Sequence, residues 1–214
     1  TNAGKSTLFN HLTGADVMVE DMLFATLDPT MRRVALPHGG PEVILSDTVG
    51  FISDLPTELV AAFRATLEEV LEADLICHVR DISHPEAEAQ ARDVAAILEN
   101  LGVKDTTPQI EVWNKIDRLD EAARRAALTQ AARLDGVQAV SAVTGQGVET
   151  LVSAISQALS AMRHVSTLHL GFDEGRRRAW LYEKDVVEDE RQTEDGFVMT
   201  VQWSARQEEQ FKDI

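Results

Sequence analysis

Hydrophobic and polar positions follow two rhythms along the middle of the chain. Short apolar runs predict buried strands, and longer stretches with apolar residues every three or four positions predict amphipathic helices. Strands and helices alternate between residues 47 and 162, which predicts a parallel sheet with helices on both faces. The predicted strands are 75–79, 109–113 and 137–140, and the predicted helices are 59–72, 86–101, 120–134 and 148–162.

The first part of the chain predicts a short helix and then a hairpin. Residues 7–12 read as a helix that stops at Gly14. Residues 31–36 and 42–46 read as strands, and the proline- and glycine-rich segment 37–41 turns between them. We therefore expect an antiparallel pair of strands directly after the first helix.

The pattern changes at about residue 163. The remaining segments predict a small α+β appendage after an α/β domain, with domains at 1–163 and 164–214. The predicted elements of the appendage are strand 165–172, helix 175–184, strands 186–192 and 197–203, and helix 205–214.

Composition narrows the classes of partner. The 214 residues carry a formal charge of −16, which argues against broad attraction to nucleic acid. Arg176-Arg177-Arg178 is the densest basic patch, either a solvated face or an RNA contact. No apolar run reaches the length of a membrane span. The single cysteine, Cys77, excludes an intramolecular disulfide, and we expect a buried thiol and a reducing, cytoplasmic setting.

Candidate chemistry begins in the first residues. Gly4-Lys5-Ser6 matches the end of a phosphate-binding loop, whose leading glycine would lie before Thr1. We therefore expect the chain to be a fragment cut inside its own active site. Lys5 would reach the β- and γ-phosphates, and the Ser6 hydroxyl would ligate Mg²⁺. The alternative is a helix cap without a ligand.

A second candidate follows the predicted strand 42–46. Asp47 stands where a strand ends, in position to hold a magnesium-bound water. Gly50 offers a backbone N–H to a γ-phosphate with no side chain in the way. Asp-x-x-Gly is a weak signal alone, and its place after a strand and beyond Gly4-Lys5-Ser6 makes it informative.

The third candidate is Asn114-Lys115-Ile116-Asp117, directly after a predicted strand. The Asp117 carboxylate can accept two hydrogen bonds from guanine, whereas adenine has no such donor pair, so a site of this kind discriminates strongly. Asn114 would brace the loops and the Lys115 stem would lie along the base. Backbone N–H groups of Ser141-Ala142-Val143 are candidates for the guanine oxygen. A polar turn is the alternative, and His78 and His84 are expected in ordinary polar roles.

Together these motifs have the order and spacing of a GTPase domain. The residues within and around the motifs resemble those of the HflX family of ribosome-associated GTPases. The stretches that carry the resemblance are 1–10, 23–30 and 47–52, and the appendage is similar as well. The resemblance implies a P-loop GTPase domain, with GTP as substrate and Mg²⁺ as cofactor. It also implies association with the large ribosomal subunit, with a role in splitting or rescue of ribosomes under stress. The N-terminal domain of the family is expected to be absent.

The resemblance assigns roles to particular residues. Lys5, Thr26 and Gly50 would act in catalysis, with Thr26 favoured over Thr30 as the switch threonine. Ser6, Thr26 and, through water, Asp47 would hold the metal. The residues expected to contact the nucleotide are Thr1, Asn2, Ala3, Gly4, Lys5, Ser6, Thr7, Phe24, Ala25, Thr26, Leu27, Asp28, Asp47, Thr48, Val49, Gly50, Asn114, Lys115, Asp117, Ser141, Ala142 and Val143.

Two residues raise questions about hydrolysis. Phe51 stands where many GTPases place a glutamine that orients the attacking water, and an apolar side chain cannot do this. Hydrolysis is then either slow or completed by a partner or an ion. Asn2 resembles the phosphate-loop asparagine of potassium-activated GTPases, which makes K⁺ a hypothesis.

Three alternatives stay open. They are an Obg-like ribosome-assembly GTPase, a non-catalytic guanine-nucleotide-binding module, and a membrane-coupled GTPase whose membrane segment lies outside this chain. We expect a monomer in the cytoplasm, with a membrane-peripheral fraction as a further possibility.

Overall fold

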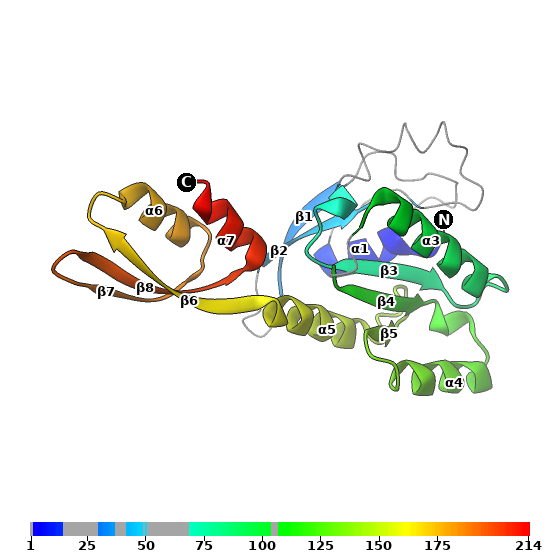
Figure 1. Ribbon diagram of the computed structural model, residues 1–214. Helices are drawn as coiled ribbons and strands as arrows, with labels where there is room; N and C mark the ends of the chain where they lie inside the picture. The colour runs from blue at the N-terminus through cyan, green and yellow to red at the C-terminus, as the bar shows by residue number, and fades with distance from the viewer. Residues whose placement is uncertain (1, 15–29, 37–41, 49, 51–68, 104–106) are drawn as a thin grey trace. The chain divides into compact units, whose positions relative to one another are not determined.

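The computed structural model describes residues 2–14, 30–36, 42–48, 50, 69–103 and 107–214 (Figure 1). The chain forms two compact units, Thr1–Gln157 and Ala158–Ile214, which we call the N-terminal and C-terminal units. The division falls inside helix α5 (Val148–Ala161), before the predicted boundary at 163/164, and that boundary stays a prediction.

A parallel sheet forms the centre of the N-terminal unit. Its strands are β3 (Ile76–Asp81), β4 (Gln109–Asn114) and β5 (Val137–Ala139), in the order β3-β4-β5. Both adjacent pairs are parallel, and the register places Asp81 beside Asn114. The carboxyl ends of β3 and β4 therefore lie side by side, which brings the polar residues at those ends together.

Helices flank this sheet, and a capping residue marks one end of two of them. Helix α3 (Ala87–Leu101) ends at Gly102, which adopts the left-handed conformation. Helix α4 (Glu121–Ala131) begins after Asp120, whose side chain accepts a hydrogen bond from the N–H of Ala123. Helix α5 buries Val148, Leu151 and Ile155 on one face. The predicted α/β class is confirmed, and most of the predicted helix 59–72 lies outside the described residues.

The first helix and the hairpin also belong to the N-terminal unit. Helix α1 (Lys5–Thr13) ends at Gly14, whose N–H donates to the carbonyl of Asn10. Strands β1 (Thr30–Ala35) and β2 (Glu42–Asp47) pair antiparallel, which confirms the predicted pair of strands. Helix α1 packs against both strands and buries Leu8 and Phe9.

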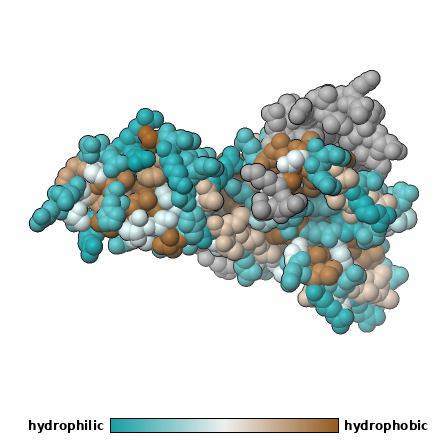
Figure 2. Space-filling view, in the orientation of Figure 1, coloured by the Kyte–Doolittle hydropathy of each residue, from teal (hydrophilic) through white to brown (hydrophobic). Residues whose placement is uncertain are grey.

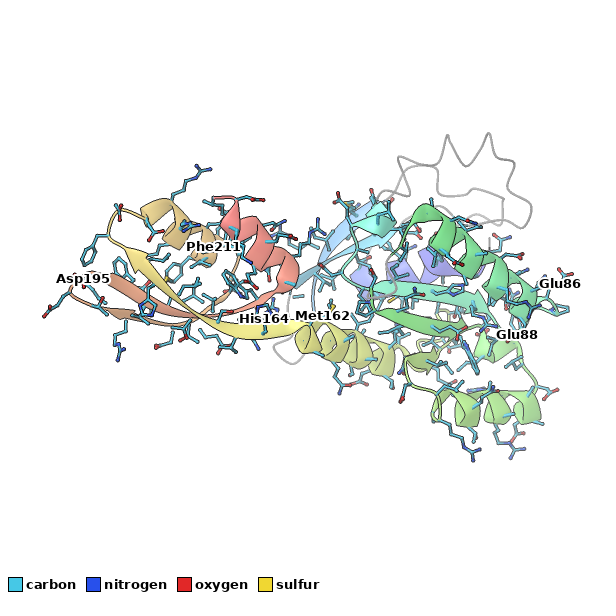
Figure 3. The ribbon with its side chains drawn as sticks, in the orientation of Figure 1. Glu86, Glu88, Met162, His164, Asp195 and Phe211 are labelled. Carbon is cyan, nitrogen blue, oxygen red and sulfur yellow. The ribbon has the colours of Figure 1, made fainter. Side chains whose placement is uncertain are left out.

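The C-terminal unit is an antiparallel sheet of three strands with two helices. Strands β6 (Arg163–Gly171), β7 (Val187–Gln192) and β8 (Gly196–Ser204) have the order β6-β8-β7. Asp195 marks the tight turn between β7 and β8 (Figure 3). The predicted α+β composition of this part of the chain is therefore observed.

Helices α6 (Gly175–Glu183) and α7 (Ala205–Lys212) pack on one face of that sheet (Figure 1). Phe211 lies between α7 and the sheet, and its ring centroid is 5.3 Å from that of Trp203. The indole N–H of Trp203 donates to the Ser166 hydroxyl at 3.0 Å, which satisfies its one polar atom. The buried core consists of Leu170, Leu181, Val186, Met199, Val201, Trp203 and Phe211.

A largely hydrophilic surface is expected for a chain with a formal charge of −16. Hydrophilic residues cover most of the described surface on the face drawn in Figure 2. No helix in the described ranges is long and apolar enough to cross a membrane.

Candidate nucleotide-binding site

The turn before α1 has the backbone that a phosphate-binding loop requires. Gly4 has φ 87°, and its carbonyl accepts the N–H of Leu8 at 3.0 Å, which begins the helix. A Cβ at position 4 would collide with the side-chain amide of Asn114. Glycine is therefore required here both by conformation and by the close approach of a second loop.

Two candidate metal ligands meet at the end of β2. The Ser6 hydroxyl donates to a carboxylate oxygen of Asp47 at 2.5 Å, although the residues are far apart in sequence. Asp47 is only 3% exposed. A hydroxyl and a carboxylate are the hard oxygen ligands that Mg²⁺ prefers, so the chemistry of this pair fits a magnesium site.

Lys5 lies in the same region. Burial lowers the pKa of its ammonium group below the ordinary value of 10.5, and the charge of Asp47 opposes that shift. A buried cation of this kind is stabilised by an anion placed beside it. Lys5 is the first residue of α1, so an anion beside its ammonium group would lie near the helix N-terminus, where anions bind favourably.

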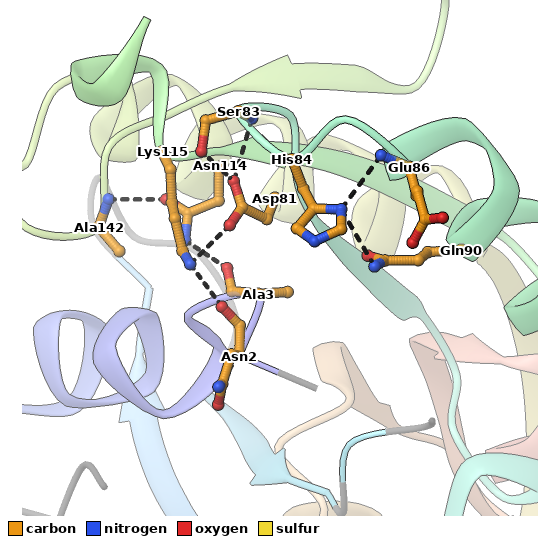
Figure 4. Close-up of polar contacts among 10 residues, drawn as sticks. All are labelled: Asn2, Ala3, Asp81, Ser83, His84, Glu86, Gln90, Asn114, Lys115 and Ala142. Atoms are coloured by element: carbon orange, nitrogen blue, oxygen red, sulfur yellow. Dashed lines mark hydrogen bonds and ion pairs between the residues drawn. The ribbon is translucent and has the colours of Figure 1, made fainter. Parts of the chain in front are cut away.

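Asn114 ties two loops together (Figure 4). Its Nδ2 donates to the carbonyl of Ala3 at 2.8 Å, and its Oδ1 accepts the N–H of Ala142 at 2.9 Å. The side chain is 1% exposed, so both bonds are shielded from water. The amide thus connects the phosphate loop to the loop after β5 at fixed spacing.

Lys115 makes a second connection to the phosphate loop. Its Nζ donates to the carbonyl of Asn2 at 2.5 Å and lies 2.7 Å from a carboxylate oxygen of Asp81. Lys115 itself has φ 67°, in the left-handed region. Asp81 was not among the predicted site residues. It ends β3 as Asp47 ends β2, but the sequence pattern placed the end of that strand at residue 79.

The loop after β5 is held from several sides. The Ser141 hydroxyl accepts the N–H of Thr144, and the Ser141 N–H donates to the carbonyl of Gln146. A Cβ at Gly147 would collide with the carbonyl of Ala139, so only glycine fits there. Arg124 of α4 hydrogen-bonds the Gln146 side chain.

Two predicted contacts of the base face solvent. Asp117 lies in a turn of 3-10 helix (Ile116–Arg118) and is exposed, and the structure records no hydrogen bond to its carboxylate from the described part of the chain. Val143 is 75% exposed. The N–H of Ala142, another predicted contact of the base, already donates to Asn114 Oδ1.

The remaining predicted residues divide into those near the site and those not described. Thr7 lies in α1, and Thr48 and Gly50 follow β2. The predictions for Thr1, Phe24, Ala25, Thr26, Leu27, Asp28, Val49 and Phe51 fall outside the described residues.

The basic patch of the C-terminal unit has a structural role in two of its three members. Arg178 makes two hydrogen bonds to the Glu190 carboxylate, at 2.7 and 2.8 Å, and lies 4.4 Å from the ring centroid of Phe197. Arg177 pairs with Glu174 at 3.0 Å and lies over the ring of Phe211. The guanidinium groups of Arg177 and Arg178 are held by carboxylates and rings of their own unit, so two of the three cations of this patch have partners within the unit.

Comparison with known proteins defines the class first. A family model described as "50S ribosome-binding GTPase" matches residues 1–115, and one described as "HflX C-terminal domain" matches residues 126–213. A solved structure of Era with MgGDPNP and nucleotides 1506–1542 of 16S ribosomal RNA is similar with a TM-score of 0.57 and 25% identity. It covers 73% of this chain and 53% of that chain. The fold is that of a P-loop GTPase.

The family follows from the relatives. A GTPase HflX of Magnetococcus marinus is 48% identical over 94% of this chain, and one of Caldanaerobacter subterraneus subsp. tengcongensis is 40% identical over 100%. The chain belongs to the HflX family. It spans about half the length of these curated relatives, 46% and 48% respectively.

Proposed function

We propose that this chain is the guanine-nucleotide switch of a ribosome-associated GTPase. One observation carries the proposal: Asn114 and Lys115 hold the backbone carbonyls of Ala3 and Asn2. These bonds join two segments more than a hundred residues apart, each with the composition of a nucleotide motif, which supports a single site. Family membership favours this reading over an Obg-like assembly GTPase.

In the proposed site, the phosphates lie at the N-terminus of α1. Lys5 places its ammonium against the β- and γ-phosphates, which compensates for the cost of burying it. Ser6, Thr26 and, through water, Asp47 would hold Mg²⁺, which would neutralise phosphate charge when bound. The backbone N–H of Gly50 donates to the γ-phosphate.

The base lies at the other end of the proposed site. The exposed carboxylate of Asp117 accepts hydrogen bonds from guanine, and the stem of Lys115 covers the base. Backbone N–H groups of the 141–143 loop serve the guanine oxygen. Since a carboxylate acceptor pair is left unsatisfied by adenine, the site selects GTP over ATP.

Hydrolysis is proposed to rest on positioning and charge rather than on a general base. Phe51 cannot orient water, so the intrinsic rate is expected to be slow and the ribosome to raise it. GTP would order the segments around Thr26 and Gly50, and hydrolysis would release them. The affinity of these two states for the large subunit would differ, with splitting or rescue of stressed ribosomes as the task of the whole protein.

Single-turnover hydrolysis of GTP by the full-length protein, with and without purified large ribosomal subunits, tests this function. We expect slow hydrolysis that the subunits accelerate. A non-catalytic binding module, which Phe51 favours as the second candidate, would bind GTP without acceleration. Failure of the folded protein to bind GTP would overturn both.

A potassium ion beside Asn2 is part of the proposal. Asn2 has φ 56° and its carbonyl is fixed by Lys115, so its side chain starts from a defined backbone. Equal hydrolysis rates in sodium and potassium at matched ionic strength would remove the ion from the account. We further propose a domain boundary at 163/164. We also propose that the protein is a monomer in the cytoplasm, with a fraction at the membrane surface.

A further inference from the structure

The end of β3 carries a carboxylate that the nucleotide motifs do not include. Asp81 is the last residue of β3 and lies beside Asn114 in the parallel register. Its side chain is 13% exposed, close to the 16% of Lys115. A nearly buried carboxylate at this edge of the sheet can orient the side chain of Lys115, which follows the neighbouring strand.

Both oxygens of Asp81 are occupied (Figure 4). Oδ1 accepts the backbone N–H of Ser83 at 3.0 Å and the Ser83 hydroxyl at 2.6 Å. Oδ2 lies 2.7 Å from Nζ of Lys115. The bonds to Ser83 fix the orientation of the carboxylate, so the oxygen that faces Lys115 has a defined place.

Lys115 passes this constraint on to the phosphate loop. The same Nζ that contacts Asp81 donates to the carbonyl of Asn2 at 2.5 Å. Asn2 and Lys115 are two of the three residues other than glycine with positive φ among the described residues, at 56° and 67°. Such conformations persist only when surrounding contacts hold them. Here the ammonium group of Lys115 contacts the backbone of Asn2, so one hydrogen bond links the two strained residues.

The charges agree with the geometry. Burial alone would raise the pKa of Asp81, but the hydrogen bonds from Lys115 and Ser83 outweigh it and lower the pKa below its ordinary value of 3.8. The carboxylate is therefore ionised at neutral pH and pairs with a cation. A nearly buried ion pair that loses one partner leaves the other charge uncompensated, so the pair is sensitive to removal of either member.

We propose that Asp81 is a positioning residue for the guanine-nucleotide site, acting through Lys115 on both the base and the phosphate loop. This rests on the proposed function and deepens it. Asp81 fixes the ammonium group, which leaves the aliphatic stem of Lys115 in place along the base. Through the carbonyl of Asn2, the same contact holds the phosphate loop in its binding conformation before the nucleotide arrives.

The test is a double-mutant cycle in the full-length protein with Asp81→Asn, Lys115→Met and the double variant. Affinities for GDP and GTP are measured by titration of fluorescent nucleotides. Asp81→Asn should weaken both by about tenfold, the size of one charge-assisted hydrogen bond. In the Lys115→Met background, Asp81→Asn should have almost no further effect, because the group through which it acts is gone.

Two further variants separate charge from fold. Asp74→Asn removes the same charge from an exposed position just before β3 and should leave affinity unchanged. Ser83→Ala keeps the Asp81 charge but loosens its orientation, so we expect a smaller loss in the same direction. Thermal unfolding without nucleotide monitors folding of each variant.

The outcomes are distinguishable. Undiminished affinity of a folded Asp81→Asn variant would overturn the inference and leave the proposed function standing. An equal loss in the wild-type and Lys115→Met backgrounds would also overturn it, since Asp81 would then act only on the local turn with Ser83. Absence of GDP binding by the wild-type protein would overturn the proposed function together with this inference.

Discussion

The two units use their polar side chains for different purposes. In the N-terminal unit, Asn114 and Lys115 reach across the sequence to hold backbone carbonyls of the phosphate loop, while Asp117 stays exposed. In the C-terminal unit, Arg177 and Arg178 pair with carboxylates of the same unit and lie over aromatic rings. The contacts of Asn114 and Lys115 join loops that carry nucleotide motifs, whereas the contacts of Arg177 and Arg178 stabilise the small core of their own unit.

This difference teaches where to look for a ligand site. Asn2 and Lys115 have positive φ, a backbone conformation of higher free energy for residues other than glycine. Such conformations are common at functional sites. Charged residues that satisfy one another stabilise a small unit and leave little for a partner. The nucleotide motifs and the arginine triplet both stand out in the sequence. Only their contacts in the structure show that the motif residues join distant loops, whereas Arg177 and Arg178 stabilise their own unit.

The largest effect on the comparison should come from the core of the C-terminal unit. Trp203 is 1% exposed, and Trp203→Ala removes its packing and its bond to Ser166. We expect a loss of about 3–5 kcal/mol in the free energy of unfolding of this unit. Native-state hydrogen exchange of strands β6 and β8 measures it.

The same variant also tests the separation of roles. Nucleotide affinity of Trp203→Ala should match the wild type, and a parallel fall in affinity would break the comparison. Val165→Ala on β6 is the control, because Val165 is 59% exposed and its truncation should change stability by less than about 0.5 kcal/mol.

The next effect should come from the amide that joins two loops. Asn114→Ala removes the bonds to Ala3 and Ala142, which should cost about 2–3 kcal/mol in unfolding free energy and also weaken nucleotide binding. Urea unfolding and nucleotide titration measure the two losses. Asn100→Ala, at an exposed position of α3, is the matched control. Full nucleotide affinity in a folded Asn114→Ala variant would refute the bracing role.

The smallest effect concerns Cys77 on β3. Burial raises the pKa of its thiol from 9.0 to about 11, so the thiolate is scarce at neutral pH. Alkylation of the native protein at pH 8 should be much slower than in urea, where the chain's only cysteine is fully exposed. The preference for the neutral thiol stabilises the fold below pH 9.0, and that contribution is lost as pH rises through about 11. Cys77 is half-buried rather than fully buried as predicted, and equal alkylation rates in both conditions would contradict even this partial protection.

Sequence patterns predicted most elements because hydrophobic periodicity and glycine stops are local signals. Helix α3, for example, ends at Gly102 as predicted, and the pair β1 and β2 was predicted from two strand-like segments on either side of a proline- and glycine-rich segment. The motifs predicted the candidate residues by type and spacing. Comparison with relatives then supplied the HflX family that the motif wording had suggested.

Contacts between distant residues were harder to predict. Asp81 was missed because the strand was predicted to end at residue 79, and only the register beside Asn114 brings its carboxylate to Lys115. The role of Arg178 on helix α6 depended on Glu190, which lies on strand β7. Such pairings follow from topology, which no local pattern contains.

The most direct test of the central claim is the base preference of Asp117→Asn in the full-length protein. We measure affinities for GTP, ATP and XTP with Mg²⁺, for the wild type and the variant. The account predicts that the wild type selects GTP and that the variant shifts its preference from guanine towards xanthine, because the amide replaces an acceptor by a donor. An unchanged preference in a folded variant would contradict a guanine site at Asp117.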